Sequence, residues 1–392
     1  MQLKFADRIT GLSASAIREI LKFSSMPGFI SFAAGSPADE AFPSKQIADI
    51  IYNAILSSPN SALNYSVTEG YTPLREFMKD YLKNTHLIGD ENDDLIITSG
   101  AQQIMDLVCK TLCNEGDCII CENPSFIGAL NAYRSYGVKL IGIDMKNDGM
   151  DTEQLEKALK ENKNVKLIYT IPNFQNPTGL CTSLEKRKQI YSLAKKYQVL
   201  IIEDNPYGDI RFEGENIKDI KTLDDENLVI YAGTFSKVLA PGLRVGYCLA
   251  DKRIIQKIVI CKQTSDVHST VISQIAAYEF IKDKNFGTHL ESIREIYKKK
   301  AHFTMNLIDE KLSDYLTYNK IEGGLFIWCK LNDIDMESFC KECAKNLVGV
   351  VPGSAFSING EKSDSFRINY SSPSEDDIVK GINILAKVAN TF

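Results

Sequence analysis

The sequence has no excess of basic residues and no long apolar segment. Its 392 residues include 45 lysines and arginines against 51 aspartates and glutamates, a formal net charge of −6. A protein that binds nucleic acid needs a positive field, so this balance argues against nucleic acid as the main partner. No run approaches the roughly 20 apolar residues that span a bilayer. The charged N-terminal stretch is not typical of a secretory signal, and we therefore expect a cytoplasmic location.

The sequence also lacks the short motifs of two large enzyme classes. It has no GxSxG, and none of its four histidines lies beside a plausible nucleophile, which disfavours a serine hydrolase. It has no GxGxxG, which disfavours a nicotinamide enzyme. The composition is otherwise average, with 44% hydrophobic and 24% charged residues. A chain of this length fits one very large domain or two unequal ones.

Ten cysteines are present, and we expect them to be free thiols. Two CxxC pairs, Cys118/Cys121 and Cys340/Cys343, raise the question of zinc. The first pair lies in a strand-like run, where residues three apart point to opposite faces. The second pair lies far away in a helical pattern, and no histidine is near either pair. We therefore expect no metal site.

Apolar, β-branched runs alternate with helical patterns through the middle of the chain. Strands are expected at 94–98, 118–121, 138–143, 166–170, 199–203, 228–231 and 245–250, with helices at 101–112, 125–136, 152–161 and 183–197. This alternation predicts an α/β fold with a mostly parallel sheet sandwiched by helices.

The pattern changes after about residue 285. A long polar helix is expected at 290–312, followed by strand-like pieces at 316–319, 325–331 and 366–369. A long helix followed by short strands predicts a smaller α+β domain. We expect three parts: an N-terminal segment (1–45) that packs with the small domain, a large domain (46–288) and a C-terminal small domain (289–392).

One lysine stands where sheets of this class place their ligands. Lys237 follows an apolar strand, Thr234 and Ser236 lie just before it, and Arg244 lies seven residues after it. A lysine in a loop is ordinarily solvated, but ligands of open α/β sheets bind at the carboxyl ends of the strands. Two hydroxyls and a guanidinium close together also suit a phosphate.

Three more strand ends carry polar groups. The segment 98–103 joins a strand to a helix, and its glycine and free N–H groups suit an anion. Asn176-Pro177 follows another strand, where it could be a simple turn. Asp204 ends a buried strand, where a carboxylate is costly unless it has a partner. Each segment, taken alone, has a structural explanation as well as a functional one.

Together, these segments resemble the fold-type I pyridoxal-phosphate aminotransferases of class I/II. The matching segments run in the family's order over nearly the whole chain: Tyr65, Gly70, Leu74-Arg75-Glu76, Ser99-Gly100-Ala101, Asn176-Pro177-Thr178-Gly179, Asp204, Tyr207, Ser236-Lys237, Arg244 and Phe366-Arg367. The segments 13–22 and 28–37 are similar to the 2-aminoadipate/kynurenine-type subgroup. Regulators carry the same domain behind a DNA-binding module, which we expect to be absent here.

The resemblance implies pyridoxal 5'-phosphate as the cofactor of the large domain and gives single residues roles. Lys237 is implied to carry the cofactor and then to move the proton of the substrate Cα. Asp204 is implied to pair with the pyridine nitrogen, while Asn176 and Tyr207 donate to the ring oxygen. Phe126 matches the residue that stacks on the ring, with a plain core aromatic as the alternative.

The resemblance also implies a phosphate site and a shared interface. The residues expected at the phosphate are Ser99, Gly100, Ala101, Gln102, Thr234, Ser236 and Arg244. Tyr65 matches a position that reaches the phosphate of the neighbouring subunit. A homodimer with active sites at the interface is therefore expected.

Substrate recognition is implied at both ends of the chain. Arg367 is expected to bind the α-carboxylate of the substrate through a bidentate fork, with a surface salt bridge as the alternative. Arg18, on a helix expected near residues 14–23, matches a position that can pair with a distal carboxylate. Gly35 and Asn176 are expected to lie against the substrate.

The leading hypothesis is an aminotransferase. It would move an amino group between an L-amino acid, of the 2-aminoadipate, aromatic or branched-chain type, and a 2-oxo acid, with 2-oxoglutarate and glutamate as one pair. A β-lyase with the same cofactor is one alternative. A non-catalytic, cofactor-binding regulatory protein is another, and the complete set of Lys237, Asp204 and Arg367 weighs against it.

Overall fold

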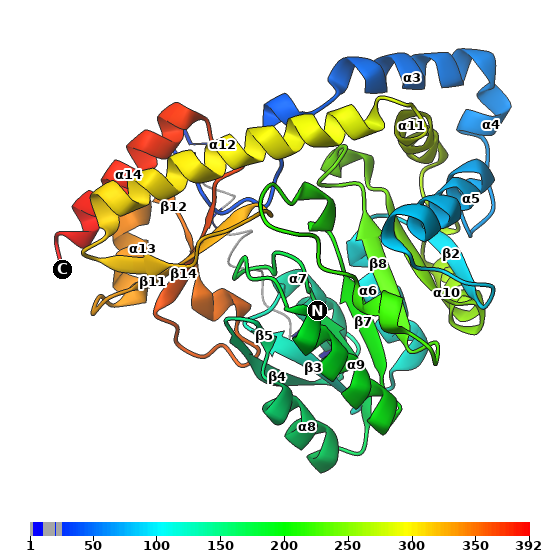
Figure 1. Ribbon diagram of the computed structural model, residues 1–392, viewed down its shortest axis with the longest axis horizontal. Coiled ribbons are helices and arrows are strands. Elements are labelled where there is room, and N and C mark those ends of the chain that lie inside the picture. Colours follow the sequence, from blue (N-terminus) through cyan, green and yellow to red (C-terminus); the bar gives the residue numbers. More distant parts are fainter. Residues whose placement is uncertain (1–2, 11–19, 21–25) are drawn as a thin grey trace.

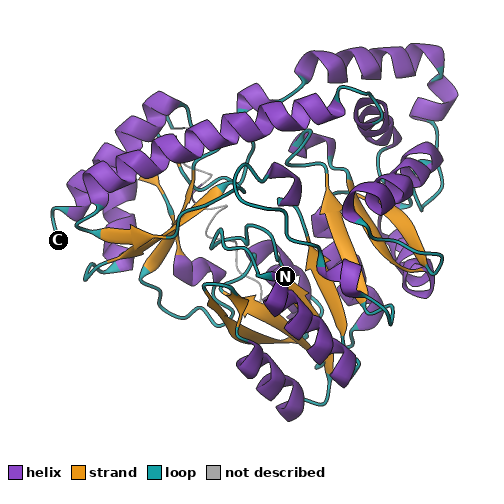
Figure 2. Cartoon of the chain, viewed as in Figure 1, coloured by secondary structure: helices purple, strands orange, loops and turns teal. Residues whose placement is uncertain are grey.

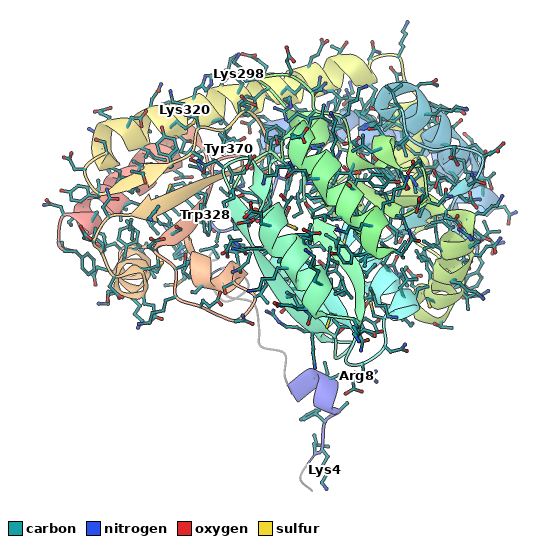
Figure 3. The ribbon with its side chains drawn as sticks, turned by 60° about the horizontal axis from the view of Figure 1, so that its bottom comes forward. Lys4, Arg8, Lys298, Lys320, Trp328 and Tyr370 are labelled. Atoms are coloured by element: carbon teal, nitrogen blue, oxygen red, sulfur yellow. The ribbon has the colours of Figure 1, made fainter. Side chains whose placement is uncertain are left out.

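The computed structural model describes residues 3–10, 20 and 26–392. Within these residues the chain forms an eight-stranded sheet, a four-stranded sheet and a two-stranded sheet, with helices packed around them (Figure 1). Figure 2 shows the two larger sheets as separate groups of strands, each with its own helices. The short helix α1 (Asp7–Thr10) lies on an N-terminal segment that projects from the rest of the molecule, with Lys4 and Arg8 exposed (Figure 3).

The eight-stranded sheet is mixed but mostly parallel. Its strand order is β2 (Asp93–Thr98), β9 (Gly246–Asp251), β8 (Val229–Thr234), β7 (Leu200–Asp204), β6 (Val165–Thr170), β3 (Cys118–Asn123), β4 (Lys139–Lys146) and β5 (Gly149–Met150). The run from β8 to β4 is parallel, whereas β9 is antiparallel to both of its neighbours and β5 is antiparallel to β4. The α/β fold class predicted from the sequence is therefore confirmed.

Both faces of this sheet are buried, because its central strands are apolar on both sides. Ile201 packs in a cluster with residues of α8 (Thr152–Glu161) and α9 (Leu184–Tyr197), while Ile202 packs on the opposite face with residues of α6 (Ala101–Leu112). A continuous apolar strand covered by helices on both faces is the pattern of parallel sheets. Two of the helices begin at side-chain caps, Asp151 for α8 and Ser183 for α9.

The register of the parallel strands brings their carboxyl ends to one edge. Thr170 pairs with Glu203 at the end of β6, and Asp204 pairs with Ala232 near the end of β8. The segments that follow β6, β7 and β8 therefore leave the sheet side by side. This edge is where open α/β sheets bind ligands.

Further helices complete the part of the chain around the large sheet: α3 (Ser44–Ser57), α4 (Pro59–Leu63), α5 (Thr72–Tyr81), α7 (Ile127–Arg134), α10 (Lys252–Asp266) and α11 (Val271–Ile281). A π-helical turn, η2 (Leu82–His86), follows α5. Short 3-10 turns are η1 (Asp39–Ala41), η3 (Gly208–Ile210), η4 (Ile220–Leu223), η5 (Pro241–Leu243) and η6 (Gly353–Phe356).

The four-stranded sheet is antiparallel, in the order β10 (Leu316–Tyr318), β11 (Phe326–Leu331), β14 (Ser365–Asn369) and β13 (Val351–Pro352). It lies with α13 (Met336–Lys345) and α14 (Glu375–Ala389) at one end of the molecule, and α12 (Phe286–Leu312) runs along the molecule toward it (Figure 1). The N-terminal strand β1 (Ile30–Ser31) pairs with β12 (Val348–Gly349). The division of the chain into three parts stays a prediction.

No helix among the described residues is both long and apolar enough to cross a membrane. The ten cysteines are free thiols. In the part of the chain that the structure describes, no three or more histidine, cysteine, aspartate or glutamate side chains gather as metal ligands would. The expected cellular location stays a prediction.

Candidate active site

One cavity opens at the carboxyl edge of the large sheet. Its volume is about 270 Å³, and it lies between that edge, β11 and β14 of the small sheet, and the N-terminal segment. Its lining residues are Gly35, Ala101, Gln102, Phe126, Ile171, Asn176, Asp204, Pro206, Tyr207, Thr234, Ser236, Lys237, Arg244, Phe326 and Arg367. Twelve of these fifteen were predicted as site residues from the sequence, so the structure brings together groups that lie hundreds of positions apart.

Lys237 lies just after β8 and is partly buried. Its Nζ donates a hydrogen bond to the Gly35 carbonyl at 2.7 Å. Burial, together with the charges of Arg367 and Arg244, lowers the pKa of Lys237 to about 8. An amine with this pKa is partly neutral near pH 7, and a neutral amine is what nucleophilic attack on a carbonyl and proton abstraction both require.

Asp204 lines the same cavity from the end of β7, the strand next to β8. Its Oδ2 accepts a hydrogen bond from the Tyr169 hydroxyl at 2.8 Å, whereas its buried Oδ1 has no partner among the described residues. Burial raises the pKa of this carboxyl group to about 7. A buried carboxylate oxygen facing a cavity without a partner needs a donor from a ligand. A protonated pyridine nitrogen is such a donor, so the site fits the implied cofactor.

Arg367 enters the cavity from β14, and only 1% of it is exposed. Its two terminal nitrogens donate to Asn176 Oδ1 at 2.7 Å and to the Ala33 carbonyl at 2.6 Å, while its buried Nε has no partner in the part of the chain that the structure describes. The guanidinium stacks over Phe326 at 4.0 Å and Phe356 at 4.9 Å. Burial lowers its pKa to about 10. No acidic side chain in the described residues pairs with it, which excludes the alternative of a salt bridge within this part of the chain.

Tyr207 and Asn176 lie between the lysine and the arginine. The Tyr207 ring packs edge-on against Phe326, with ring centres 5.9 Å apart. Burial raises the pKa of the Tyr207 hydroxyl well above its ordinary value, while Arg367 lowers it. A phenol that stays protonated at neutral pH can donate a hydrogen bond into the cavity.

A cup suited to a phosphate forms where α6 begins. Gly100, with a φ of 78°, starts the helix, and a Cβ at this position would overlap the Arg244 guanidinium. Arg244 donates to the Ser99 carbonyl at 3.1 Å, and the Thr234 and Ser236 hydroxyls lie 3.0 Å apart beside it. Free N–H groups, hydroxyls and a guanidinium therefore meet at one place, as a phosphate requires.

Three predicted residues among those that the structure describes, Ser99, Gly100 and Tyr65, do not line this cavity; Gly100 lies at the start of α6. The Ser99 hydroxyl turns away, toward Asp266 at 3.2 Å and Ser269 at 3.0 Å. Tyr65 is 86% exposed, and its ring lies edge-on to His268, with ring centres 5.8 Å apart. Arg18 lies outside the described residues, as does nearly all of the helix expected around it.

Three lining residues were missed from the sequence, Ile171, Pro206 and Phe326, and so was Tyr169, which does not line the cavity but binds Asp204. Phe326 holds Tyr207 and Arg367 in place, yet in the sequence it is one apolar residue of a strand. The preceding Gly323-Gly324 turn was the available signal. In the sequence Tyr169 is one residue of an apolar strand, and only the structure shows that its hydroxyl donates to Asp204.

Comparison with known proteins identifies the family of the chain. Residues 27–385 match the family "Aminotransferase class I and II". The chain is 37% identical, over 98% of its length and 93% of the relative's, to aromatic-amino-acid aminotransferase 1 of Thermococcus litoralis. It is 34% identical, over 96% of its length and 94% of the relative's, to 2-aminoadipate transaminase of Thermus thermophilus.

Two solved structures share the whole fold. Kynurenine aminotransferase of Pyrococcus horikoshii, crystallised with PMP, has a TM-score of 0.94 and 36% identity over 99% of this chain and 97% of its own. The α-aminoadipate aminotransferase of Thermus thermophilus, complexed with N-(5'-phosphopyridoxyl)-L-leucine, has a TM-score of 0.91 and 32% identity over the same shares.

The chain therefore belongs to the class I and II aminotransferases, and it is a pyridoxal-phosphate-dependent aminotransferase. Within the family it stands near the aromatic, 2-aminoadipate and kynurenine aminotransferases, at about 35% identity. The resemblance, the enzyme class and the cofactor expected from the sequence are confirmed.

Proposed function

We propose that this enzyme moves the amino group between an L-amino acid, of the aromatic, 2-aminoadipate or branched-chain type, and a 2-oxo acid, with 2-oxoglutarate and glutamate as one pair. The observation that carries the proposal is the single cavity shared by Lys237, Asp204 and Arg367. The substrate range is supported by the relatives, which are an aromatic-amino-acid, a 2-aminoadipate and a kynurenine aminotransferase.

Pyridoxal phosphate, when bound, supplies an electron-withdrawing ring that stabilises negative charge at the substrate Cα. The cup around Gly100 and Arg244 would hold its phosphate. The unpartnered Oδ1 of Asp204 would hold its protonated ring nitrogen, which gives this buried carboxylate the cationic partner it lacks. Phe126 lines the same cavity and would stack on the ring.

Lys237 has two roles in this proposal. Its Nζ would hold the cofactor when the cofactor is bound, and the same amine, once free, would take the proton from the substrate Cα and carry it. Because its pKa is lowered to about 8, a useful fraction is neutral near pH 7. Asn176 and Tyr207 line the same cavity and would donate hydrogen bonds to the cofactor when it is bound.

Arg367 binds the α-carboxylate of the substrate. It is buried, stacked between two aromatic rings and held by Asn176, so its orientation is fixed before substrate arrives. Its Nε is a donor that none of the described residues uses. Gly35 lies at the same wall and leaves room there, because a Cβ at this position would come within 3.2 Å of the Phe326 ring. Arg18 stays a candidate for a distal carboxylate.

We further propose that the enzyme acts as a homodimer. Tyr65 is 86% exposed and takes no part in its own cavity, and large apolar side chains are exposed on the neighbouring α3 and α4, namely Tyr52, Leu56 and Leu63. Burying these side chains against a second copy would remove apolar surface from water. The same contact would bring Tyr65 to the phosphate cup of the partner.

The test is a panel of amino donors with 2-oxoglutarate as the acceptor. We expect glutamate to form, with the highest kcat/KM for aromatic amino acids, kynurenine or 2-aminoadipate. A β-lyase would instead release pyruvate and ammonia from a cysteine conjugate without any oxo acid. That result, with no glutamate formed from any donor, would contradict the proposal.

A further inference from the structure

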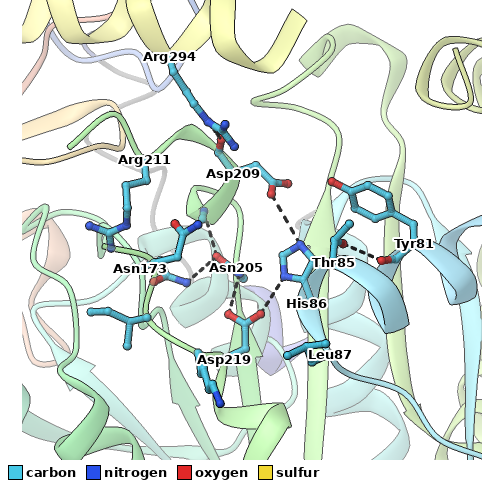
Figure 4. Close-up of a pocket in the computed structure, with 14 residues that line it drawn as sticks. Tyr81, Thr85, His86, Leu87, Asn173, Asn205, Asp209, Arg211, Asp219 and Arg294 are labelled. Carbon is cyan, nitrogen blue, oxygen red and sulfur yellow. Dashed lines mark hydrogen bonds and ion pairs between the residues drawn. The ribbon is translucent and has the colours of Figure 1, made fainter. Parts of the chain in front are cut away.

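A second cavity lies behind the loop that carries Asp204 and Tyr207. Its volume is about 350 Å³, and its walls come from the end of η2, the segment 205–219 and Arg294 of α12. Figure 4 shows Asn205 near its centre, with Asn173, Asp219 and His86 around it. Asn205 directly follows Asp204, so one short segment presents Asp204 to the first cavity and Asn205 to the second.

Asn205 uses its full hydrogen-bonding capacity. Its Oδ1 accepts from Asn173 Nδ2 at 3.1 Å and from the Gly208 N–H at 3.0 Å. Its Nδ2 donates to Asp219 Oδ1 at 3.2 Å and to the Tyr231 hydroxyl at 2.9 Å. The residue is only 8% exposed. A side-chain amide offers two donors and two acceptor positions, so none of them is left free.

These four bonds connect the parts of the chain that build the first cavity. Asn173 belongs to the segment that carries Asn176, and Gly208 directly follows Tyr207. Through one oxygen, Asn205 therefore joins the loop of Tyr207 to the loop of Asn176. Its amide nitrogen joins both loops to Tyr231, on the strand that leads to Lys237.

The partners of Asn205 are themselves fixed. The terminal Nη2 of buried Arg187 donates to Asn173 Oδ1 at 2.7 Å, which sets the orientation of that amide. Asp219 Oδ2 lies 2.9 Å from His86 Nδ1, and His86 Nε2 lies 3.6 Å from Asp209 Oδ1. A buried polar cluster with every member satisfied is rigid, and removing one member leaves several groups without partners.

We propose that Asn205 is a positioning residue for the amino-transfer reaction: from behind the active-site cavity, it fixes the loop of Asp204 and Tyr207 relative to the loop of Asn176. This inference rests on the proposed function, because it matters only if those three residues act on the cofactor. Asn205 itself touches neither cofactor nor substrate, since it does not line the first cavity.

The test compares Asn205→Ala with a matched control, Asp209→Asn, in the full-length enzyme loaded with pyridoxal phosphate. Asp209 lines the same second cavity, and its carboxylate contacts His86, at 3.6 Å, and not Asn205. For Asn205→Ala we expect kcat to fall roughly 10- to 100-fold, because small misplacements of catalytic groups cost this much. We also expect the pH midpoint of the visible absorbance to rise, because Tyr207 and Asn176 no longer donate to the ring oxygen in register. For Asp209→Asn, both quantities should stay at the wild-type value.

The outcomes separate the inference from the proposed function. Wild-type enzyme whose visible band no amino acid bleaches would overturn the proposed function, and the inference with it. A wild-type response together with unchanged kcat and pH midpoint in Asn205→Ala would overturn the inference alone. Equal changes of kcat and of the pH midpoint in Asn205→Ala and Asp209→Asn would also overturn it, because they would then reflect a general loss of stability. If Asn205→Ala does not fold, Asn205→Ser, which keeps one hydrogen-bonding group, is judged by the same criteria.

Discussion

At the scale of single residues, burial is the main cause of the unusual ionisation in the pocket. It is the largest factor that lowers the pKa values of Lys237 and Arg367 and raises that of Asp204. Each shift weakens the charged form of its group. A site built in this way is poised for a charged ligand, because the ring nitrogen, the phosphate and the substrate carboxylate each bring the missing counter-charge.

The lowered pKa of Lys237 predicts how the cofactor-free enzyme takes up pyridoxal phosphate. The rate of attachment should rise with pH and level off with a midpoint near pH 8, because only the neutral amine reacts. At pH 7 about one lysine in ten is then neutral, against about one in several thousand for an ordinary lysine. Stopped-flow absorbance between pH 6 and 10 measures this rate. A rate that still rises steeply beyond pH 10 would contradict it.

Arg367→Lys tests the proposed carboxylate site. A lysine keeps the charge but loses the planar fork, the stacking on Phe326 and the bond to Asn176. We expect kcat/KM for amino donors to fall by about 100-fold, the size typical of breaking a buried charged pair. Cofactor content, read from the visible band, should stay at the wild-type level and serves as the control. Unchanged kcat/KM would show that Arg367 does not bind substrate.

Residues of the active-site cavity were predictable from the sequence where a charged group stands at a position that is costly for it. Lys237 with its neighbouring hydroxyls, and Asp204 at the end of a buried strand, stand out because such groups are costly in those places. Phe326 and Asn205 do not stand out, because their roles depend on partners from distant segments. Asn205 meets Asn173, Asp219 and Tyr231 only after three strands have been aligned.

At the scale of secondary-structure elements, polar side chains connect turns to strand ends. His86, at the end of the π-helical turn η2, contacts Asp209 and Asp219 of the segment that follows β7. Burial disfavours the charged ring of His86, but hydrogen bonds and charges from Asp209 and Asp219 outweigh it and raise the pKa to about 10. The Tyr231 hydroxyl also lies 3.5 Å from the ring.

This cluster predicts a loss of stability at alkaline pH. The pKa of His86 is higher in the folded state than its unfolded value of about 6.5. Its contribution to stability is therefore complete below about pH 6.5, shrinks as the pH rises and is lost above about pH 10. His86→Gln should be less stable than wild type at pH 6, and the difference should close by pH 10. Urea unfolding of both proteins across this range measures it, and a difference independent of pH would contradict the ion-pair explanation.

Element types were largely predictable, whereas strand direction was not. The apolar runs that form β6, β7 and β8 are buried on both faces. In the sequence these runs alternate with helical patterns, which is why the strands could be predicted. β9 is buried in the same way but runs antiparallel to both of its neighbours. Its direction is set by the path of the preceding loop, which hydrophobic periodicity does not record. The short strand β5 was missed for the simpler reason that two residues carry no period.

At the scale of the whole molecule, an acidic chain concentrates positive charge in one place. The net charge is −6, yet the active-site cavity is lined by Lys237, Arg244 and Arg367 against one carboxylate, Asp204. The charge of the sequence argued against nucleic acid as the main partner. The structure adds that this local excess of cations suits a doubly anionic cofactor and an anionic substrate.

The proposed homodimer predicts complementation between two defective chains. Tyr65→Ala should weaken cofactor binding, because the partner's phosphate would lose a donor, and Lys237→Ala should be inactive. In a mixed dimer, the site with intact Lys237 would receive Tyr65 from the other chain. We therefore expect mixing the two variants, under conditions that exchange subunits, to restore cofactor affinity at that site.

The control for this experiment is Tyr65→Ala exchanged with itself, which should show no recovery. Titration of pyridoxal phosphate against the visible band measures the affinity in each case. If the mixture binds no better than Tyr65→Ala alone, Tyr65 does not serve a partner's site. A protein that sediments as a monomer at all concentrations would contradict the shared-site proposal at an earlier step.

The most direct test of the central claim is a half-reaction in the cuvette. Purified enzyme carrying pyridoxal phosphate is mixed with one amino acid at a time, without any oxo acid, and the visible absorbance is recorded. We predict that an aromatic amino acid or 2-aminoadipate bleaches the band to completion, that 2-oxoglutarate restores it, and that Lys237→Ala shows neither change. If no amino acid bleaches the band of the wild-type enzyme, the assignment of Lys237 and its pocket to amino transfer is wrong.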